Sequence, residues 1–359
     1  MYSVRDLEGG AEMAKYIMDM QTDKKEEFYF IREKESHDIV YLPSKYLMHK
    51  KRSKLSPNTI RRSAFILSYY LNFMDELDLH LDDIYQMNYM DQHEHFTDFL
   101  IWLQAGEHSR EDYSKLPNNE TCNAYLKEVF RFYTFMEQEN KQSENLKVLS
   151  DAQMIVRNSI GLRRVLNRKS FRGYLKEKGH QGKTIEQDKI VGLLQECANS
   201  RDQVLLLLLA ETGFRIGELL GVRYAEDIDY EKHIIYVNFR EDNENRARAK
   251  NAEFRRAKIS DATFDILMFY IEDYKELIFG QEYLFINVSG DYVGQPFKGS
   301  GVYAMLRRLE RKTGIKASPH MLRHYFANAR RKDGWKLEMI SQALGHRNIE
   351  TTMKYLNIT

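Results

Sequence analysis

The sequence has little cysteine and no hydrophobic run long enough to cross a membrane. Only two of its 359 residues are cysteines, Cys122 and Cys197, which supply neither a disulfide framework nor the ligand spacing of a metal site. The longest apolar run, around Leu205–Leu209, is far shorter than the roughly 20 residues of a membrane-spanning helix. The acidic, tyrosine-containing N-terminus does not resemble a signal peptide. We therefore expect a soluble protein of the reducing cytoplasm, without a membrane or metal partner.

The sequence also lacks a net charge of either sign, since 54 Lys and Arg residues nearly cancel 53 Asp and Glu residues. Its basic residues are concentrated instead in two stripes, residues 50–62 and 157–183. Such stripes can neutralise phosphates, although a solvated helix face or linker explains either stripe alone equally well. The candidates for DNA contact are Lys50, Lys51, Arg52, Lys54, Arg61, Arg62, Arg163, Arg164, Arg168, Lys169 and Arg172.

The length of the chain predicts two or three domains. We expect an N-terminal extension of unknown role, a helical domain, a basic linker and a mainly helical domain with a small antiparallel sheet, over residues 1–44, 45–165, 166–183 and 184–359. Within the extension, a helix is expected near Gly10–Met20, and strands at Phe28–Ile31 and Ile39–Leu42.

Local signals mark the starts of several helices. Ser56 and Pro57 are typical of an N-cap and a first turn, and residues 118–121 begin a second helix whose aromatic stripe we expect in a core. Thr184 and Gln187 stand at the positions of a capping box that would open the last domain.

An arginine follows a strongly apolar segment within Glu211–Leu220. Residues 204–210 predict a buried helix, and Gly213 is typical of the left-handed residue that ends one. Arg215 should then lie in a tight turn between two buried helices, held ready to bind a charge. A structural ion pair with Glu218 is the plainer interpretation, and the two are compatible.

A histidine and an arginine lie three residues apart within Ser318–His324. Pro319 fits the first turn of a helix, which places His320 and Arg323 on one face. A helix N-terminus favours an anion, and guanidinium binds phosphate bidentately. On its own this pattern is better explained as a surface helix with a basic first turn, because such short patterns recur by chance.

The C-terminal residues add a second histidine and a tyrosine. Lys336–Leu344 predicts an amphipathic helix closed by Gly345, and Ile349–Leu356 predicts another, with His346 in the connection. Tyr355 follows His346 by nine positions.

Together these blocks resemble the tyrosine recombinase (phage integrase) family. The resemblance covers residues 45–356 and rests on Glu211–Leu220, Ser318–His324, Leu344–His346, Glu350–Tyr355 and the Ser56–Ile60 helix start. It implies a helical core-binding domain and a catalytic domain that close round duplex DNA as a C-shaped clamp. It also favours Tyr355 as the nucleophile over Tyr325, a simpler core residue, and over Tyr303.

The resemblance further implies a catalytic lysine on a β-hairpin. His233–Phe239 and Arg255–Ser260 have the composition of its two strands. Lys250 stands a few residues before the returning arginine pair, as the family lysine does, and Lys258 is the alternative. The connection between the strands is longer and poorer in glycine than the family pattern, which leaves this choice open.

By resemblance, the catalytic residues are Arg215, Lys250, His320, Arg323, His346 and Tyr355, with Glu218 in support. They imply DNA cleavage and rejoining through a 3′-phosphotyrosyl link without metal, nucleotide or other cofactor, in a homotetramer on specific DNA sites, with accessory proteins as further partners. We expect a transposon- or phage-borne enzyme that integrates, excises or resolves a DNA element. The alternatives are a type IB topoisomerase or hairpin-forming resolvase with the same chemistry, and a DNA-binding accessory protein that does not cut.

Overall fold

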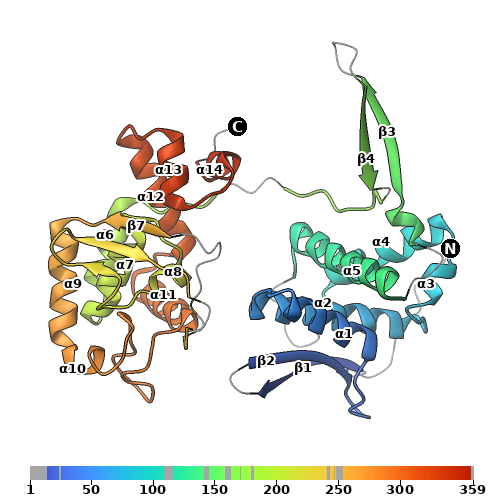
Figure 1. Ribbon diagram of the computed structural model, residues 1–359, viewed down its shortest axis with the longest axis horizontal. Helices are drawn as coiled ribbons and strands as arrows, with labels where there is room; N and C mark the ends of the chain where they lie inside the picture. Colours follow the sequence, from blue (N-terminus) through green and yellow to red (C-terminus); the bar gives the residue numbers. More distant parts are fainter. Residues whose placement is uncertain are drawn as a thin grey trace. The chain divides into compact units, whose positions relative to one another are not determined.

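The structure is a computed structural model and describes residues 14–23, 26–108, 116–140, 145–157, 163–169, 171–178, 182–240, 243–245, 247 and 254–356. Its contacts divide the chain into two compact units, Met1–Gly179 and His180–Thr359, which are drawn in Figure 1. Within these ranges, no helix is both long and apolar enough to span a bilayer. The expected fold class, mainly helical with small antiparallel sheets, is confirmed.

The first described element of the first unit is a β-hairpin, where a helix was expected. Strands β1 (Tyr16–Asp23) and β2 (Glu26–Glu33) pair antiparallel, with Met18 opposite Ile31. The helix expected up to Met20 is therefore wrong over β1, because Tyr16 and Met18 alternate along a strand and pack on the core of the unit. The strand expected near residue 30 is confirmed, whereas the one expected to reach Leu42 gives way to a helix at Tyr41.

Helices form the body of this unit. They are α1 (Tyr41–Arg52), α2 (Pro57–Glu76), α3 (Asp83–Gln86), α4 (Tyr89–Ala105) and α5 (Asn119–Asn140), followed by the 3₁₀ turn η2 (Lys147–Leu149). As predicted, the Ser56 hydroxyl caps α2 and Asn118 caps α5. Phe132 of its aromatic stripe and the neighbouring Val129 are fully buried. Tyr70 lies at the centre of this core, where its hydroxyl bonds Tyr133 at 2.8 Å.

A second hairpin follows where a helical end and a linker were expected. Strands β3 (Asp151–Arg157) and β4 (Arg163–Lys169) pair antiparallel, with Asp151 opposite Lys169. Residues 151–156 combine apolar and β-branched residues in the run Ala-Gln-Met-Ile-Val, a composition that favours a strand.

The second unit surrounds a buried helix. Its elements are α6 (Gln187–Gln195), α7 (Ser200–Thr212), α8 (Ile216–Leu219), β5 (Ile228–Asp229), β6 (Ile234–Val237), β7 (Arg255–Lys258), α9 (Asp261–Asp273), α10 (Lys275–Ile278), α11 (Gly299–Thr313), α12 (Pro319–Lys332), α13 (Leu337–Leu344) and α14 (Ile349–Tyr355). The apolar helix α7 packs against α9 and α12, and β5, β6 and β7 form one antiparallel sheet in that order.

The starts and ends of these elements match most of the local signals. The Ser318 hydroxyl caps α12, Pro319 lies in its first turn, and Gly213 and Gly345 end α7 and α13 in the left-handed conformation. The capping box expected from Thr184 is wrong, because α6 begins at Gln187 and its N-cap position, Glu186, makes no side-chain cap.

Candidate active site

Arg215 is fixed by the turn between α7 and α8. Gly213 has a φ of 65° in this turn, and a Cβ there would lie 2.4 Å from the Phe326 ring. Glu218 accepts hydrogen bonds from the Arg215 backbone N–H at 2.6 Å and from Nη1 at 2.9 Å. Arg215 Nη2 also donates to the Gly345 carbonyl at 3.3 Å. Because Glu218 is only 4% exposed, it holds the guanidinium from a buried position.

Arg323 projects from α12 into the same region. It is 2% exposed, its Nη1 donates to the Gly213 carbonyl at 2.5 Å, and its Nη2 donates to the Leu344 carbonyl. The backbone ends of α7 and α13 thus hold the arginine in place. Burial, and then the neighbouring charge of Arg215, lower the pKa of Arg323 to about 10.

Arg255, at the start of β7, is a third arginine that sequence reasoning did not assign to the site. It is 8% exposed, forms an ion pair with Glu218, and donates from Nη1 to the Ala343 carbonyl at 2.8 Å. Burial, then the charges of Arg323 and Arg215, lower its pKa to about 9. The adjacent arginines Arg255 and Arg256 were noticed in the sequence, but only as a landmark for choosing the catalytic lysine.

The three guanidinium groups carry more positive charge than Glu218 can neutralise. Burial and, after it, the neighbouring arginine charges disfavour the charged forms of Arg255 and Arg323, so an anion at this position is stabilising. Buried arginines held by backbone carbonyls are preorganised for phosphate oxygens.

His346 lies beside these arginines. Its Nε2 is 3.2 Å from Arg323 Nη2, and its Nδ1 is 2.9 Å from the hydroxyl of the buried Thr352. Burial, then the charges of the arginines led by Arg323, lower the pKa of His346 to about 3. The imidazole is therefore neutral at neutral pH, with Nε2 accepting from Arg323 and Nδ1–H donating to Thr352.

Tyr355, at the end of α14, points its hydroxyl at His320. Tyr355 Oη lies 2.9 Å from Nδ1 and 3.1 Å from Nε2 of the exposed His320 ring. The Arg323 guanidinium lies 5.9 Å from the centre of the Tyr355 ring. Neither alternative tyrosine has such surroundings, because Tyr325 packs on the core and Tyr303 is 50% exposed.

His324 is the other residue that sequence reasoning passed over. Its ring stacks on Tyr355 with centroids 3.8 Å apart and planes 9° apart. The motif Arg323-His324 contains it, but nothing in the local pattern separates it from a core residue.

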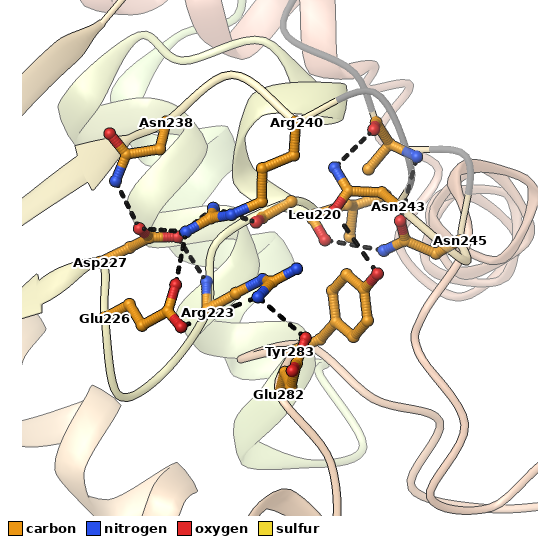
Figure 2. A network of polar contacts seen from close by, with 12 residues as sticks. Leu220, Arg223, Glu226, Asp227, Asn238, Arg240, Asn243, Asn245, Glu282 and Tyr283 are labelled. Atoms are coloured by element: carbon orange, nitrogen blue, oxygen red, sulfur yellow. Dashed lines mark hydrogen bonds and ion pairs between the residues drawn. The ribbon is translucent and has the colours of Figure 1, made fainter.

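Lys250 lies outside the described residues, and the alternative, Lys258, is an exposed residue of β7 paired with Ile234. Figure 2 shows how the connection that carries Lys250 is anchored. The Asn245 side chain is buried and donates to the Leu220 and Phe297 carbonyls at 2.7 and 3.2 Å. The Tyr283 hydroxyl accepts from the Glu244 backbone N–H at 2.9 Å.

The same network fixes the residues that precede this connection. Both terminal nitrogens of Arg240 bind the fully buried carboxylate of Asp227, at 2.7 and 2.9 Å. The Asn238 amide donates to the same carboxylate at 2.6 Å. The connection therefore leaves β6 from a rigid base.

The residues proposed for DNA contact fall into different environments. Lys50 is 7% exposed, its ammonium bonds Ser63 at 2.7 Å, and it forms an ion pair with Glu128. The Lys50 ammonium is therefore not presented at the surface, and its contact with DNA stays a prediction. Lys51 is paired with Glu26 at 2.8 Å.

The remaining candidates of the first unit that the structure describes are exposed, namely Arg52, Lys54, Arg61, Arg62 and Arg172. Arg61 and Arg62 line a surface cavity of about 370 Å³ on α2 and α5 and lie over the rings of Phe65 and Tyr125. The side chains of Arg163, Arg164, Arg168 and Lys169 lie outside the described part of the chain, although β4 contains their backbone.

Known proteins match either the second unit or most of the chain. Residues 183–359 match the model of the phage integrase family. Transposase A from transposon Tn554 of Staphylococcus aureus is 26% identical over 333 residues, which are 90% of this chain and 89% of that protein. Tyrosine recombinase XerA of Saccharolobus solfataricus is 32% identical over 176 residues, which are 49% of this chain and 52% of that one.

Solved structures show the same fold. A lambda integrase dimer bound to a core site aligns with a TM-score of 0.59 at 12% identity and covers 88% of this chain and 94% of its own. The Tn1549 transposon integrase in complex with transposon right end DNA aligns with a TM-score of 0.57 at 16% identity, covering 88% and 93%.

The family match and the similar proteins identify the class as that of the tyrosine recombinases. More particularly, residues 183–359 are a phage integrase family domain, and the chain as a whole is similar to a transposon-encoded member of that class.

Proposed function

We propose that this protein is a site-specific recombinase that cuts and rejoins DNA with Tyr355 as nucleophile. The carrying observation is that Tyr355 Oη hydrogen-bonds His320 while its ring lies beside the buried Arg323. Arg323 lies near Arg215 and Arg255, the two arginines paired with Glu218. A scissile phosphate bound by these arginines would lie within reach of the phenol oxygen.

The reaction is a transesterification in two balanced steps. Tyr355 Oη attacks phosphorus, the bond to the 5′-oxygen breaks, and a 3′-phosphotyrosyl link and a free 5′-hydroxyl result. A 5′-hydroxyl of another strand then attacks that phosphorus and releases the tyrosine. One phosphodiester replaces another in each step, so the reaction is proposed to proceed without metal or ATP.

Each side chain has a distinct part in this chemistry. His320 accepts the phenol proton, which is needed because an unperturbed tyrosine has a pKa of about 10. Arg215 and Arg323 stabilise the charge on the nonbridging oxygens. His346 hydrogen-bonds the phosphate as its Nε2–H tautomer, in which Nδ1 accepts from the Thr352 hydroxyl. Lys250 protonates the departing 5′-oxygen.

The working assembly is proposed to be a homotetramer on duplex DNA with specific sites, since strand exchange joins two duplexes. The exposed arginines of the first unit, led by Arg61 and Arg62, would bind its backbone. Likeness to a transposase over 90% of the chain supports a mobile-element role in the cytoplasm, with accessory proteins as further partners.

Replacing Tyr355 tests this proposal directly. With a nicked substrate that traps the cleaved state, Tyr355→Phe should abolish the covalent protein–DNA complex and leave DNA affinity within about twofold, because only the attacking oxygen is lost. Tyr325→Phe is the matched control and should form the complex normally. A normal complex with Tyr355→Phe would refute the assignment, and relaxation of supercoils without exchange between defined sites would favour a topoisomerase.

A further inference from the structure

The Tyr355 ring lies flat against His324, which has no part in the chemistry described above. The two ring centroids are 3.8 Å apart and their planes differ by 9°. His324 Nδ1 lies 3.0 Å from the Tyr355 carbonyl oxygen, to which it donates as the Nδ1–H tautomer. Because His324 is 2% exposed, one buried imidazole contacts both the ring and the backbone at the end of α14.

This contact differs from those of the other two histidines near the ring. His320 and His346 meet Tyr355 edge-on, with interplanar angles of 71° and 61° and centroids about 5 Å away. An edge contact leaves the ring free to tilt, whereas a stacked face restricts both side-chain torsions of the tyrosine. His324 is therefore the contact that sets the direction of the phenol oxygen.

Gly182 lies against the Cε1 atom of the His324 ring. A Cβ at position 182 would lie 2.2 Å from His324 Cε1 and 2.8 Å from both ring nitrogens. Carbon contacts this short do not occur, so a side chain at this position must displace the imidazole. The ring is thus in contact with both the chain at Gly182 and the face of Tyr355.

We infer that His324, backed by Gly182, is a positioning residue that holds the Tyr355 phenol in its attacking orientation. The inference rests on the proposed role of Tyr355 as nucleophile. Attack in line with the leaving oxygen requires close alignment, and a displacement of about 1 Å can cost roughly 100-fold in rate. Simple core packing is the competing explanation, and it predicts losses of stability without a selective loss of cleavage.

Two substitutions separate the ring from its hydrogen bond. His324→Phe keeps a flat ring and loses the donor, whereas His324→Gln keeps an N–H donor and loses the ring. In single-turnover cleavage of a nicked substrate, we expect His324→Phe to stay within about threefold of wild type and His324→Gln to fall about 100-fold. DNA affinity should change less than about twofold, and religation should slow by the same factor as cleavage, because Tyr355 leaves through the geometry by which it attacks.

His233→Gln is the matched control. His233 also stacks on an aromatic ring, that of Phe264, with centroids 3.7 Å apart and planes 13° apart. It lies in the turn between β5 and β6, and its replacement should leave cleavage unchanged.

Gly182 gives a test that alters neither stacked ring. Gly182→Ala should slow cleavage about tenfold or more by pushing the imidazole toward Tyr355. In a His324→Ala background the space is open, and the same change should have no further effect, a coupling that a double-mutant cycle measures. Gly299→Ala, where a Cβ meets nothing within 4 Å, is the control. This arm decides the question if His324→Gln fails to fold.

Three results would overturn the inference: wild-type cleavage by His324→Gln, a folded His324→Phe variant as slow as His324→Ala, or a neutral Gly182→Ala. These are distinct from failure of the proposed function. If Tyr355→Phe abolishes the covalent complex while the His324 variants cut normally, only the positioning role is wrong. If Tyr355→Phe still forms the complex, the nucleophile itself is misassigned.

Discussion

Glu218 stabilises the folded, DNA-free protein because it lies among positively charged arginines. It is 4% exposed and bonds both Arg215 and Arg255, while Arg323 is close enough for its charge to lower the pKa of Arg255. A carboxylate in this position lets the arginines remain charged in the absence of DNA. When a phosphate arrives, the remaining positive charge is available to it.

Replacing Glu218 should therefore destabilise the DNA-free protein. Glu218→Gln leaves the arginines without a counter-charge, and loss of one partner of a buried ion pair costs roughly 3–5 kcal/mol. Sulfate should restore stability more in this variant than in wild type, because it binds the folded site. Urea unfolding with and without sulfate measures both effects.

Glu226→Gln is the comparison, since Glu226 is paired with Arg240 but its side chain is 59% exposed. It should cost less than about 1 kcal/mol. Equal losses for the two variants, or no sulfate effect, would contradict this account of the site.

At the scale of elements, the connection that carries Lys250 follows β6 and precedes β7 in the sequence, and the network of Figure 2 holds its described residues Asn243 and Asn245. Asn245 and Ala247 are anchored at one end, and Arg255 is anchored at the other. Residues 248–254 lie between these anchors and are half the length of the 241–254 connection. The anchor at Leu220 follows α8 directly, so the short helix that begins beside Arg215 also restrains this connection.

A substrate with a different leaving group can identify which lysine protonates the departing 5′-oxygen. Lys250→Ala should cut a normal phosphodiester about 100-fold or more slower than wild type does. Its cleavage rate should recover on a substrate with a bridging 5′-phosphorothiolate, because a thiolate departs without a proton. Arg323→Ala should not recover, since it stabilises the nonbridging oxygens. Recovery by Lys258→Ala, with normal cutting by Lys250→Ala, would assign the role to the β7 residue.

The elements of the site could be predicted because their signals are local. Ser318 and Pro319 start α12, and Gly213 and Gly345 end the helices that precede Arg215 and His346. Each signal acts within a few residues, so the sequence suffices to place it.

Contacts between distant residues could not be predicted in this way. Lys50 is buried by a partner 78 residues away, Glu128, and His324 contacts Tyr355 across 31 residues. No periodicity or cap records such a contact. The β1 hairpin was missed for a related reason, because its alternating apolar residues gain their meaning only from the helices they pack on.

On the scale of the whole molecule, the chain divides its tasks between two units. The second contains the three arginines and the proposed nucleophile, while the first presents exposed Arg61 and Arg62 on a helix that is capped by Ser56. Because these arginines lie over aromatic rings, their guanidinium groups are held in place at the surface.

The salt dependence of DNA binding should distinguish these exposed arginines from the buried Lys50. Each phosphate contact contributes a slope of about 0.9 to the fall of log K with log salt. Arg62→Ala should therefore weaken binding and reduce the slope by about 1 for any sequence. Lys50→Met should leave the slope unchanged and lower the unfolding free energy instead, because it removes the buried cation paired with Glu128 and leaves that buried carboxylate with the ion pair to the exposed Arg131. Titrations of the protein with duplex DNA between 50 and 200 mM salt, together with urea unfolding, measure both quantities.

Two outcomes would contradict this prediction. A reduced slope for Lys50→Met with normal stability would show that Lys50 contacts DNA. An unchanged slope for Arg62→Ala would remove α2 from the DNA-binding surface.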